Sequence, residues 1–444
     1  MSLIRTRRTP SPVVAPIATA DDRWASLVPV AALAYPTFLQ PLTNFRPPAA
    51  YARLSELQNV AGADSNIANQ IFWLALLAAG LFRFRRRLGL LGALFVHPAV
   101  LLIATYLAVA ALSVSWASAP DIALRRLVLQ TVVISITVCS IFLTANRERI
   151  LNGMVLLASA IVVVNLLFVA AFPPGRLGYL GIYSNKNILG LVGSLCFLFL
   201  AYGALVRQRL SRVAFLGLAV LALLLVALSQ SKTSLGFVLI APIMAASLLW
   251  LQGLLRIHML ALVLAVVFAG STLAGLFSQI SGMGFDDLSL ALLGDDTFTG
   301  RTQIWSFVLG VYERSPYVGT GYASFWGTGI NSVAFLEAPG FIVGLLQAHN
   351  GYLDVLLETG LLGFAVLVAM ILASLNHANP SPGTPREVRW LALSIMLFVV
   401  FHNLLESSWF RAFSAQWLAF VVATALMLPP PFALRSKRAA SPRS

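Results

Sequence analysis

Charged residues are scarce in this sequence. Asp, Glu, Lys and Arg make up 10% of its 444 residues, whereas hydrophobic residues make up 59%. Soluble domains carry about 25% charged residues, so this chain lacks the polar surface that a water-soluble fold needs. We therefore expect an all-α fold: a polytopic integral membrane protein built as a helical bundle.

Cysteine is also scarce, because the chain holds only Cys139 and Cys196, both within apolar runs. This placement excludes a disulfide framework and indicates small buried hydrophobic side chains. Residues 1–22 are basic and rich in Pro and Ser, and they lack the apolar core of a cleavable signal peptide. The first membrane helix is then expected to act as the insertion signal.

Acidic residues are in the minority, with 16 Asp and Glu against 30 Lys and Arg. In a soluble protein this excess would suggest nucleic-acid binding. Here the basic residues form short clusters between apolar runs, which is the positive-inside pattern of membrane proteins. We expect the lipid bilayer as a partner and no nucleic acid.

Apolar stretches of about 20 residues, each long enough to cross a bilayer, recur along the chain. We expect about 12 transmembrane helices: nine within residues 24–277 and three within 349–428. A large periplasmic loop with amphipathic helices is expected at 278–348, and basic cytoplasmic tails at 1–23 and 429–444. The expected spans are 25–42, 67–82, 98–115, 127–144, 151–172, 188–206, 213–228, 235–251, 259–277, 352–375, 390–405 and 410–428.

The basic clusters give these spans an expected orientation. With both termini cytoplasmic, the cluster RFRRR (83–87), the cluster at 207–212 and both tails fall on the cytoplasmic side. A minority of basic residues then faces the periplasm, together with His349, and we expect the active site there. These residues are Arg46, Arg53, Arg125, Arg126, Arg176, Lys186, Lys232, Arg301, Arg314 and Arg411.

The stretch QAHNGYLDVLLETGLLG at 347–363 changes from polar to apolar. If it is helical from its start, His349 shares one face with Leu353, and Asn350 shares the next with Asp354. An imidazole at this water boundary can titrate near neutral pH and move protons. A plainer interpretation is a helix start with polar capping residues.

Lys232 and Arg301 are the cations with the most informative surroundings. Lys232 lies between two apolar runs in LSQSKTSL, where a lysine is costly unless it meets an anion or reaches water. Arg301 is expected in the first turn of an amphipathic surface helix that ends before Pro316, next to free backbone N–H groups that favour phosphate. The simpler alternatives are an interfacial lysine that reaches water and an arginine at the membrane surface.

Further polar residues on the same side are weaker candidates. Arg176 and the SNKN turn with Lys186 and Asn187 offer hydrogen-bond donors, although Asn and Ser at a helix start are ordinary caps. Glu406 follows His402 by four residues, and a structural pair is favoured over a contact with an outer arginine or a sugar. The pairs Asp286–Asp287 and Asp295–Asp296 lack a recognisable metal spacing, so solvated loop is favoured and no metal or cofactor is expected.

The sequence contains neither a P-loop nor a Rossmann fingerprint. Nucleotide-activated substrates are scarce outside the inner membrane, so lipid-linked phosphorylated substrates remain. A polyprenyl diphosphate sugar carries its own leaving group. An enzyme that uses it needs cations for the departing diphosphate and one base for the attacking sugar hydroxyl.

Four motifs, GRLGYLGIYSNKNILG, SQSKTS, TGRTQIW with SPYVGTGY, and AHNGYLDVLLETGLLG, occur in an order that resembles the O-antigen ligase and polysaccharide polymerase family, which includes exopolysaccharide polymerases of the inner membrane. The resemblance covers residues 176–363, and the expected span layout extends it to the whole chain. Each motif alone is modest, whereas the combination is specific.

The resemblance implies that His349 is the catalytic base and that Arg301 binds the diphosphate. Ligases of the family usually carry Arg where this chain has Lys232, and lysine keeps the charge but loses the bidentate fork. The SKTS form is closer to the exopolysaccharide polymerases. Diphosphate-binding candidates are thus Arg301, Lys232 and Arg176, with supporting candidates Asn350, Asp354, Glu358, Lys186, Asn187 and Glu406.

The expected function is an inverting, metal-independent glycosyltransferase of the bacterial inner membrane. As a polymerase it would join a polyprenyl diphosphate-linked glycan to another lipid-linked repeat unit. As a ligase it would use lipid A-core as the glycan acceptor. A flippase or transporter is the alternative of another class, although its charges should lie near mid-membrane in paired repeats. Other polysaccharide assembly and export proteins are expected partners.

Overall fold

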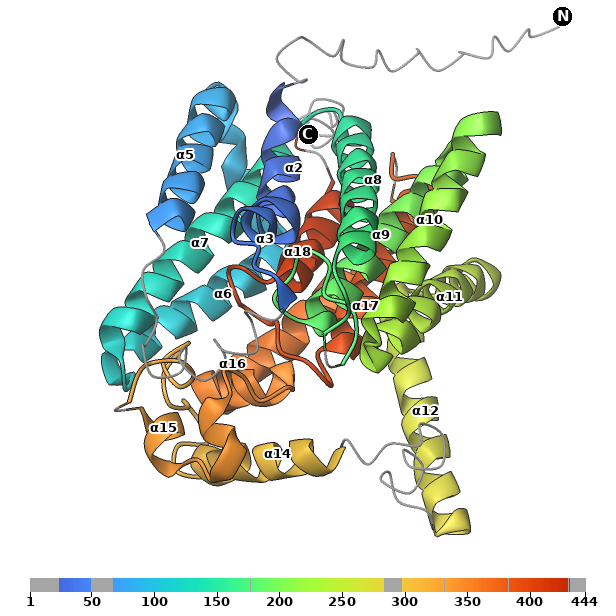
Figure 1. Cartoon of the computed structure of the whole chain (residues 1–444). Helices are drawn as coiled ribbons and strands as arrows, with labels where there is room; N and C mark the ends of the chain where they lie inside the picture. The colour runs from blue at the N-terminus through green and yellow to red at the C-terminus, as the bar shows by residue number, and fades with distance from the viewer. Residues whose placement is uncertain are drawn as a thin grey trace, which may run out of the picture.

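The computed structural model describes residues 24–48, 67–175, 177–282, 298–330, 332–381, 383–429 and 431. Within these ranges the regular structure is helical and forms no sheet (Figure 1). This confirms the predicted all-α class. In chain order the elements are α2 Leu27–Ala34, the π-helical turn η1 Tyr35–Leu39, α3 Gln40–Thr43, α5 Ile67–Phe84, the 3₁₀ helix η2 Leu88–Val96, α6 Pro98–Ser113, η3 Val114–Trp116, α7 Pro120–Leu143, α8 Arg147–Ala171, α9 Lys186–Val206, α10 Arg209–Ser229, α11 Lys232–Leu255, α12 Met259–Ser281, α14 Phe298–Tyr312, α15 Val333–Glu337, η4 Gly340–Gly344, α16 Gly351–Asn376, α17 Arg386–His402 and α18 Ala415–Met427.

Nine helices of the described chain, α5 to α12 and α16, are long and apolar enough to cross a membrane. The apolar helix of residues Leu27–Thr43 and helix α18 are shorter, and α17 has 17 residues. Each of the expected spans therefore coincides with a helix, although three of them are shorter than a full span. The chain is a polytopic membrane protein.

Helix α18 lies in the middle of the bundle (Figure 1), and all of its residues are buried. It packs against α17, α7 and α9. By contrast, α5 and α12 expose many large apolar side chains, such as Ile71 and Phe268. This is the pattern of a bundle whose outer helices face lipid.

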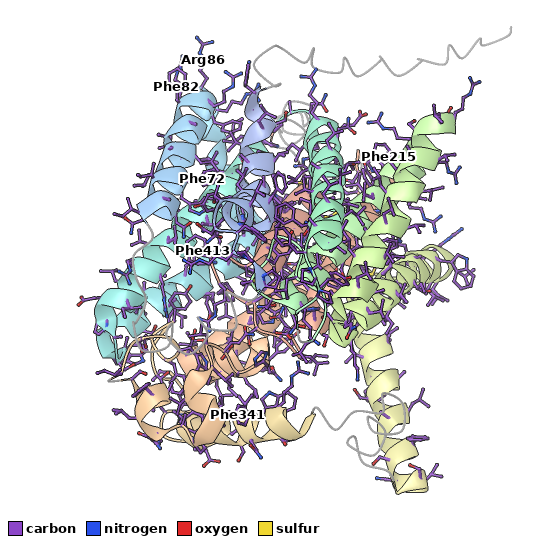
Figure 2. The ribbon with its side chains drawn as sticks, viewed as in Figure 1. Phe72, Phe82, Arg86, Phe215, Phe341 and Phe413 are labelled. Atoms are coloured by element: carbon purple, nitrogen blue, oxygen red, sulfur yellow. The ribbon has the colours of Figure 1, made fainter. Side chains whose placement is uncertain are left out.

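The two ends of the bundle differ in character. Arg86, from the RFRRR cluster, lies at one end, and Phe341 lies at the opposite end (Figure 2). Helix α14 runs across this second end, near α15 and the start of α16 (Figure 1).

Helix α16 is interrupted at Gly360, whose φ of 63° and ψ of −165° are not helical. Backbone groups around the break bond to an adjacent loop: Leu361 N donates to Pro316 O at 2.9 Å, and Gly321 N donates to Glu358 O at 3.0 Å. A Cβ on Gly360 would lie 2.3 Å from the Tyr317 carbonyl carbon. Backbone N–H and C=O groups without a hydrogen-bond partner are not tolerated inside a membrane protein. The hydrogen bonds from this loop satisfy such groups at the break and hold the first half of α16 in place.

Candidate active site

The turn before α16 is clamped to the segment that follows α17. Asn350 caps α16 by accepting hydrogen bonds from Tyr352 N at 3.0 Å and Leu353 N at 3.2 Å. Gly351 N donates to Asn403 O at 2.8 Å and to Glu406 O at 3.0 Å. A Cβ on Gly351 would lie 2.2 Å from Asn403 Oδ1, so only glycine permits this close approach.

His349 lies just outside the helix. The expectation that it shares a helical face with Leu353 is wrong, because α16 begins at Gly351 and His349 has a left-handed φ of 51°. Asn350 takes the capping position, so the residue before it must leave the helical path. Left-handed backbone is uncommon for residues other than glycine and clusters at functional sites.

Glu406 contacts site residues from several parts of the chain. Its Oε2 lies 3.2 Å from Nδ1 of His349, and its Oε1 lies 3.5 Å from Nη2 of Arg301. Asn187 donates from Nδ2 to Oε1 at 2.8 Å, and Gln347 donates from Nε2 to Oε2 at 3.3 Å. The carboxylate thus joins α9, α14 and the turn before α16, although the Glu406 side chain is only 11% exposed.

The charge state of Glu406 follows from these partners. Burial raises the pKa of the Glu406 carboxyl, but the hydrogen bond from His349 and the nearby His349, His402 and Arg301 charges lower it more, so the net pKa lies below its ordinary value. Glu406 is therefore ionised at neutral pH. A carboxylate only accepts hydrogen bonds, so the proton of a neutral His349 ring lies on Nδ1 and the lone pair on Nε2.

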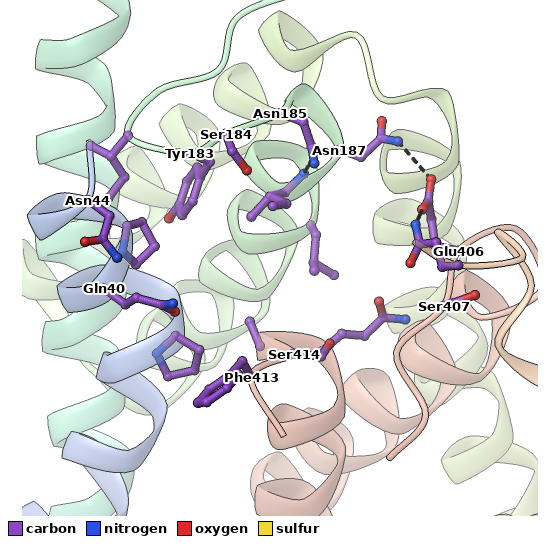
Figure 3. A pocket seen from close by; sticks show the side chains of 18 of the residues that line it. Gln40, Asn44, Tyr183, Ser184, Asn185, Asn187, Glu406, Ser407, Phe413 and Ser414 are labelled. Atoms are coloured by element: carbon purple, nitrogen blue, oxygen red, sulfur yellow. Dashed lines mark hydrogen bonds between the residues drawn. The ribbon is translucent and has the colours of Figure 1, made fainter. Parts of the chain in front are cut away.

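Beside this pair lies a cavity of about 1070 Å³ that His349, Glu406 and Gln347 help to line. Its walls come from residues 36–46, the turn before α9, residues 347–349 and the segment that joins α17 to α18. Figure 3 shows Gln40 and Asn44 across the cavity from Glu406 and Ser407. Several side-chain amides face the space, together with one arginine, Arg46. The cavity combines a base, a carboxylate and many neutral hydrogen-bonding groups.

The predicted diphosphate cations have different positions. Arg301 reaches Glu406 from the first turn of α14. Lys232 is the first residue of α11, and the supporting candidate Lys186 donates from Nζ to Gln230 O at 3.3 Å. None of Arg301, Lys232 and Lys186 is among the described residues that line the cavity. Arg176 and both Asp pairs lie outside the described residues.

The SQSKTS motif nevertheless contacts the site through its serines. Ser231 Oγ donates to Ser234 Oγ at 3.0 Å, and Ser234 Oγ lies 3.1 Å from Nε2 of His402. His402 lines the cavity. The motif therefore packs behind one wall of the cavity.

Asp354 and Glu358, both predicted as supporting residues, are buried in the first half of α16. Asp354 accepts hydrogen bonds from Ala348 N at 3.2 Å and from Trp326 Nε1 at 2.8 Å. Glu358 pairs with Arg411 at 2.7 Å. Asp354 holds the backbone just before His349, whereas Glu358 also accepts from Ala323 N at 3.0 Å. Neither carboxylate lines the cavity.

Several residues contribute to the site without a signal in their local sequence. Trp305 is one: its Nε1 donates to Ala348 O at 3.1 Å, a contact that nothing in its local sequence indicates. Arg46 and Arg411 appeared only among the periplasmic basic residues, because nothing in their local sequence distinguishes them. Burial lowers the pKa of Arg411, but Glu358 and Asp354 raise it more, so this arginine keeps its charge.

No group of three or more His, Cys, Asp or Glu side chains within the described ranges is arranged to hold a metal ion. The site consists of an imidazole, one carboxylate, cations and amides. Such a set suits acid–base chemistry on a substrate that supplies its own leaving group.

Comparison with known proteins gives two matches. A family model described as O-antigen ligase matches residues 217–368, a segment that includes Lys232, Arg301 and His349. A curated relative, the exopolysaccharide production protein ExoQ of Rhizobium meliloti (strain 1021), is 28% identical over 357 residues, which cover 76% of this chain and 78% of the relative. The middle of the chain is therefore similar to O-antigen ligases, and most of its length is similar to an exopolysaccharide production protein.

Proposed function

We propose that the chain is a polysaccharide polymerase. It transfers a glycan from a polyprenyl diphosphate, such as undecaprenyl diphosphate, to a sugar hydroxyl of another lipid-linked repeat unit. The observation that carries this proposal is the His349–Glu406 pair on the wall of a large cavity rich in amide groups. The name of the curated relative, an exopolysaccharide production protein, favours polymer synthesis over other reactions of the family.

In the proposed reaction, Nε2 of His349 takes the proton of the acceptor hydroxyl. The hydroxyl oxygen attacks the anomeric carbon of the donor sugar, and the bond from that carbon to the diphosphate oxygen breaks. The diphosphate leaves with the electron pair. Direct displacement from the opposite side inverts the anomeric configuration, and Glu406 stabilises the imidazolium that forms.

The departing diphosphate needs positive charge. Arg301 lies next to the base through Glu406, and Arg46 lines the cavity itself. We further assign Lys232 and Arg176 to this role from the family resemblance. Because Glu406 partly neutralises Arg301, a second cation at the cavity helps to hold a dianionic group.

We also propose that both termini lie in the cytoplasm and that the cavity faces the periplasm of a bacterial inner membrane. The arginines at 83–87 and those at 207–212 argue for a cytoplasmic side. By the same topology, residues 36–46, 182–188, 347–349 and 402–416, which contribute to the cavity, all fall on the other side. The assignment of 278–348 as a large periplasmic loop, between groups of spans at 24–277 and 349–428, belongs to the same proposal.

A ligase is the second candidate, because the matching family model is described as O-antigen ligase. In that case the acceptor is lipid A-core. The two reactions leave different intermediates in a strain that lacks the gene. A polymerase deletion accumulates single lipid-linked repeats, whereas a ligase deletion accumulates long polymer on the lipid carrier.

The test is mass spectrometry of lipid-linked glycans from the deletion strain and from the strain complemented with wild type. Single repeats that become long polymer on complementation support the polymerase. Long lipid-linked polymer in the deletion strain overturns it in favour of the ligase. Repeats confined to the cytoplasmic leaflet instead indicate a transporter.

A further inference from the structure

The first membrane helix changes its path where it reaches the cavity. Between α2 and α3 the chain makes a π-helical turn, Tyr35–Leu39, with Pro36 inside it and Pro41 just after it. Turns of this kind inside α-helices are rare and occur frequently at functional sites. This turn stands directly before Gln40, one of the residues that line the cavity.

The altered path is stabilised by the turn before α9. Pro41 has no N–H group, so it cannot donate to the carbonyl of Thr37, its i−4 partner. Instead, the hydroxyl of Tyr183 donates to Thr37 O at 2.8 Å. Tyr183 is buried and also lines the cavity. The turn before α9, which contains Tyr183, thus holds the π-helical segment in place.

The π-helical turn and α3 form the cavity wall that faces Glu406, the partner of His349. Gln40 and Asn44 lie across the cavity from Glu406 and Ser407 (Figure 3). Gln40 is half-buried and Asn44 is exposed, so both side chains are accessible to a ligand. A carboxamide offers both donors and acceptors, which suits sugar hydroxyls, and its lack of charge does not suit a diphosphate.

This wall lies outside the segment that the family model matches, residues 217–368. That segment contains the candidate base and the Arg301 cation. The candidate base and Arg301 therefore come from that segment, whereas the opposite wall comes from the N-terminal part of the chain. Changes in this wall could therefore alter which sugar binds while the candidate base and Arg301 stay the same.

We propose that Gln40 and Asn44 form the subsite for the acceptor sugar, whose hydroxyl His349 deprotonates. This inference rests on the proposed function. Because the base lies on one side of the cavity, an acceptor sugar that contacts it extends toward the opposite wall. The amides then fix which hydroxyl points at Nε2 of His349.

The test uses full-length protein in lipid nanodiscs with two probes. An allyl glycoside of the repeat unit can accept a glycan but cannot donate one, because it lacks the diphosphate. Farnesyl diphosphate reports binding of the lipid diphosphate, because it lacks the sugar. The variants are Gln40→Leu, Asn44→Ala and, as a matched control, Gln303→Ala on the exposed face of α14, away from the cavity.

We expect the KM for the allyl glycoside to rise about tenfold in each wall variant, the loss of roughly one substrate hydrogen bond. Inhibition by farnesyl diphosphate should stay at the wild-type level, and Gln303→Ala should change neither quantity. An unchanged KM in active wall variants overturns the inference, as does a selective loss of farnesyl diphosphate inhibition. A wild-type protein that transfers no glycan to the glycoside would instead contradict the proposed function itself.

Discussion

Oε2 of Glu406 lies 3.2 Å from Nδ1 of His349, although 57 residues separate them in the chain. Replacing the carboxylate by an amide in Glu406→Gln keeps the size of the side chain but removes the charge that stabilises an imidazolium. We expect kcat to fall by about 10²-fold or more, with a smaller effect on KM.

The matched control is Glu337→Gln, which removes an exposed carboxylate paired with Arg314. It should leave kcat of glycan transfer unchanged. Equal activity in Glu406→Gln and wild type would show that the pair has no catalytic role.

The lowered pKa of Glu406 also predicts a pH dependence of stability. A carboxyl whose pKa is lower in the folded state stabilises the fold above its unfolded pKa, close to 4.5, and loses this contribution as pH falls through the folded value. Wild type should therefore exceed Glu406→Gln in thermal stability at pH 7, and the difference should shrink as the pH falls below 4.5. The measurement is thermal unfolding of both proteins in detergent across this range. A difference that grows toward acid pH would contradict the assigned charge state.

Trp305 contacts the turn before α16 through Ala348. Its indole N–H donates to Ala348 O, while Asp354 accepts from Ala348 N on the other side. Trp305→Phe keeps an aromatic ring and removes the donor, so stability should change by only about 1 kcal/mol. We expect kcat to fall roughly fivefold, because His349 is held less firmly in its left-handed conformation.

Trp250→Phe on the exposed surface of α11 is the control. Both variants are compared by steady-state kinetics and thermal unfolding. If the two retain equal kcat, Trp305 is only a packing residue.

Gly360 breaks α16 so that the loop at residues 316–321 can bond to it. Its backbone conformation is essentially restricted to glycine, and a Cβ would lie 2.3 Å from Tyr317. We expect Gly360→Ala to destabilise the protein by roughly 3 kcal/mol. Gly236→Ala, at an open position of α11, should be neutral or slightly stabilising. Thermal unfolding in detergent compares the two, and equal stability of both variants would contradict a strained break.

Several features were predictable because they depend on local sequence. Apolar length identified the helices, and the polar-to-apolar change at 347–363 located His349. Three features were not predictable. Asn350 caps α16, as the plainer interpretation of this stretch allows, but the left-handed backbone of His349 just before it has no signal in the local sequence. The i,i+4 spacing of His402 and Glu406 suggested a structural pair, but α17 ends at His402, which leaves Glu406 beyond the helix to meet His349 and Arg301. The break at Gly360 depends on backbone hydrogen bonds to the loop at residues 316–321, which the helical periodicity of the sequence does not predict.

The central claim is that His349 is the base for glycan transfer. Its most direct test is an assay of purified protein in nanodiscs with a lipid-linked repeat unit, comparing wild type, His349→Ala and His258→Ala. His258 lies before α12 and outside the cavity lining, so it controls for loss of an imidazole. We predict long polymer from wild type and His258→Ala, and a loss of at least about 10³-fold in rate for a folded His349→Ala. Polymer formed by His349→Ala at the wild-type rate would contradict the account.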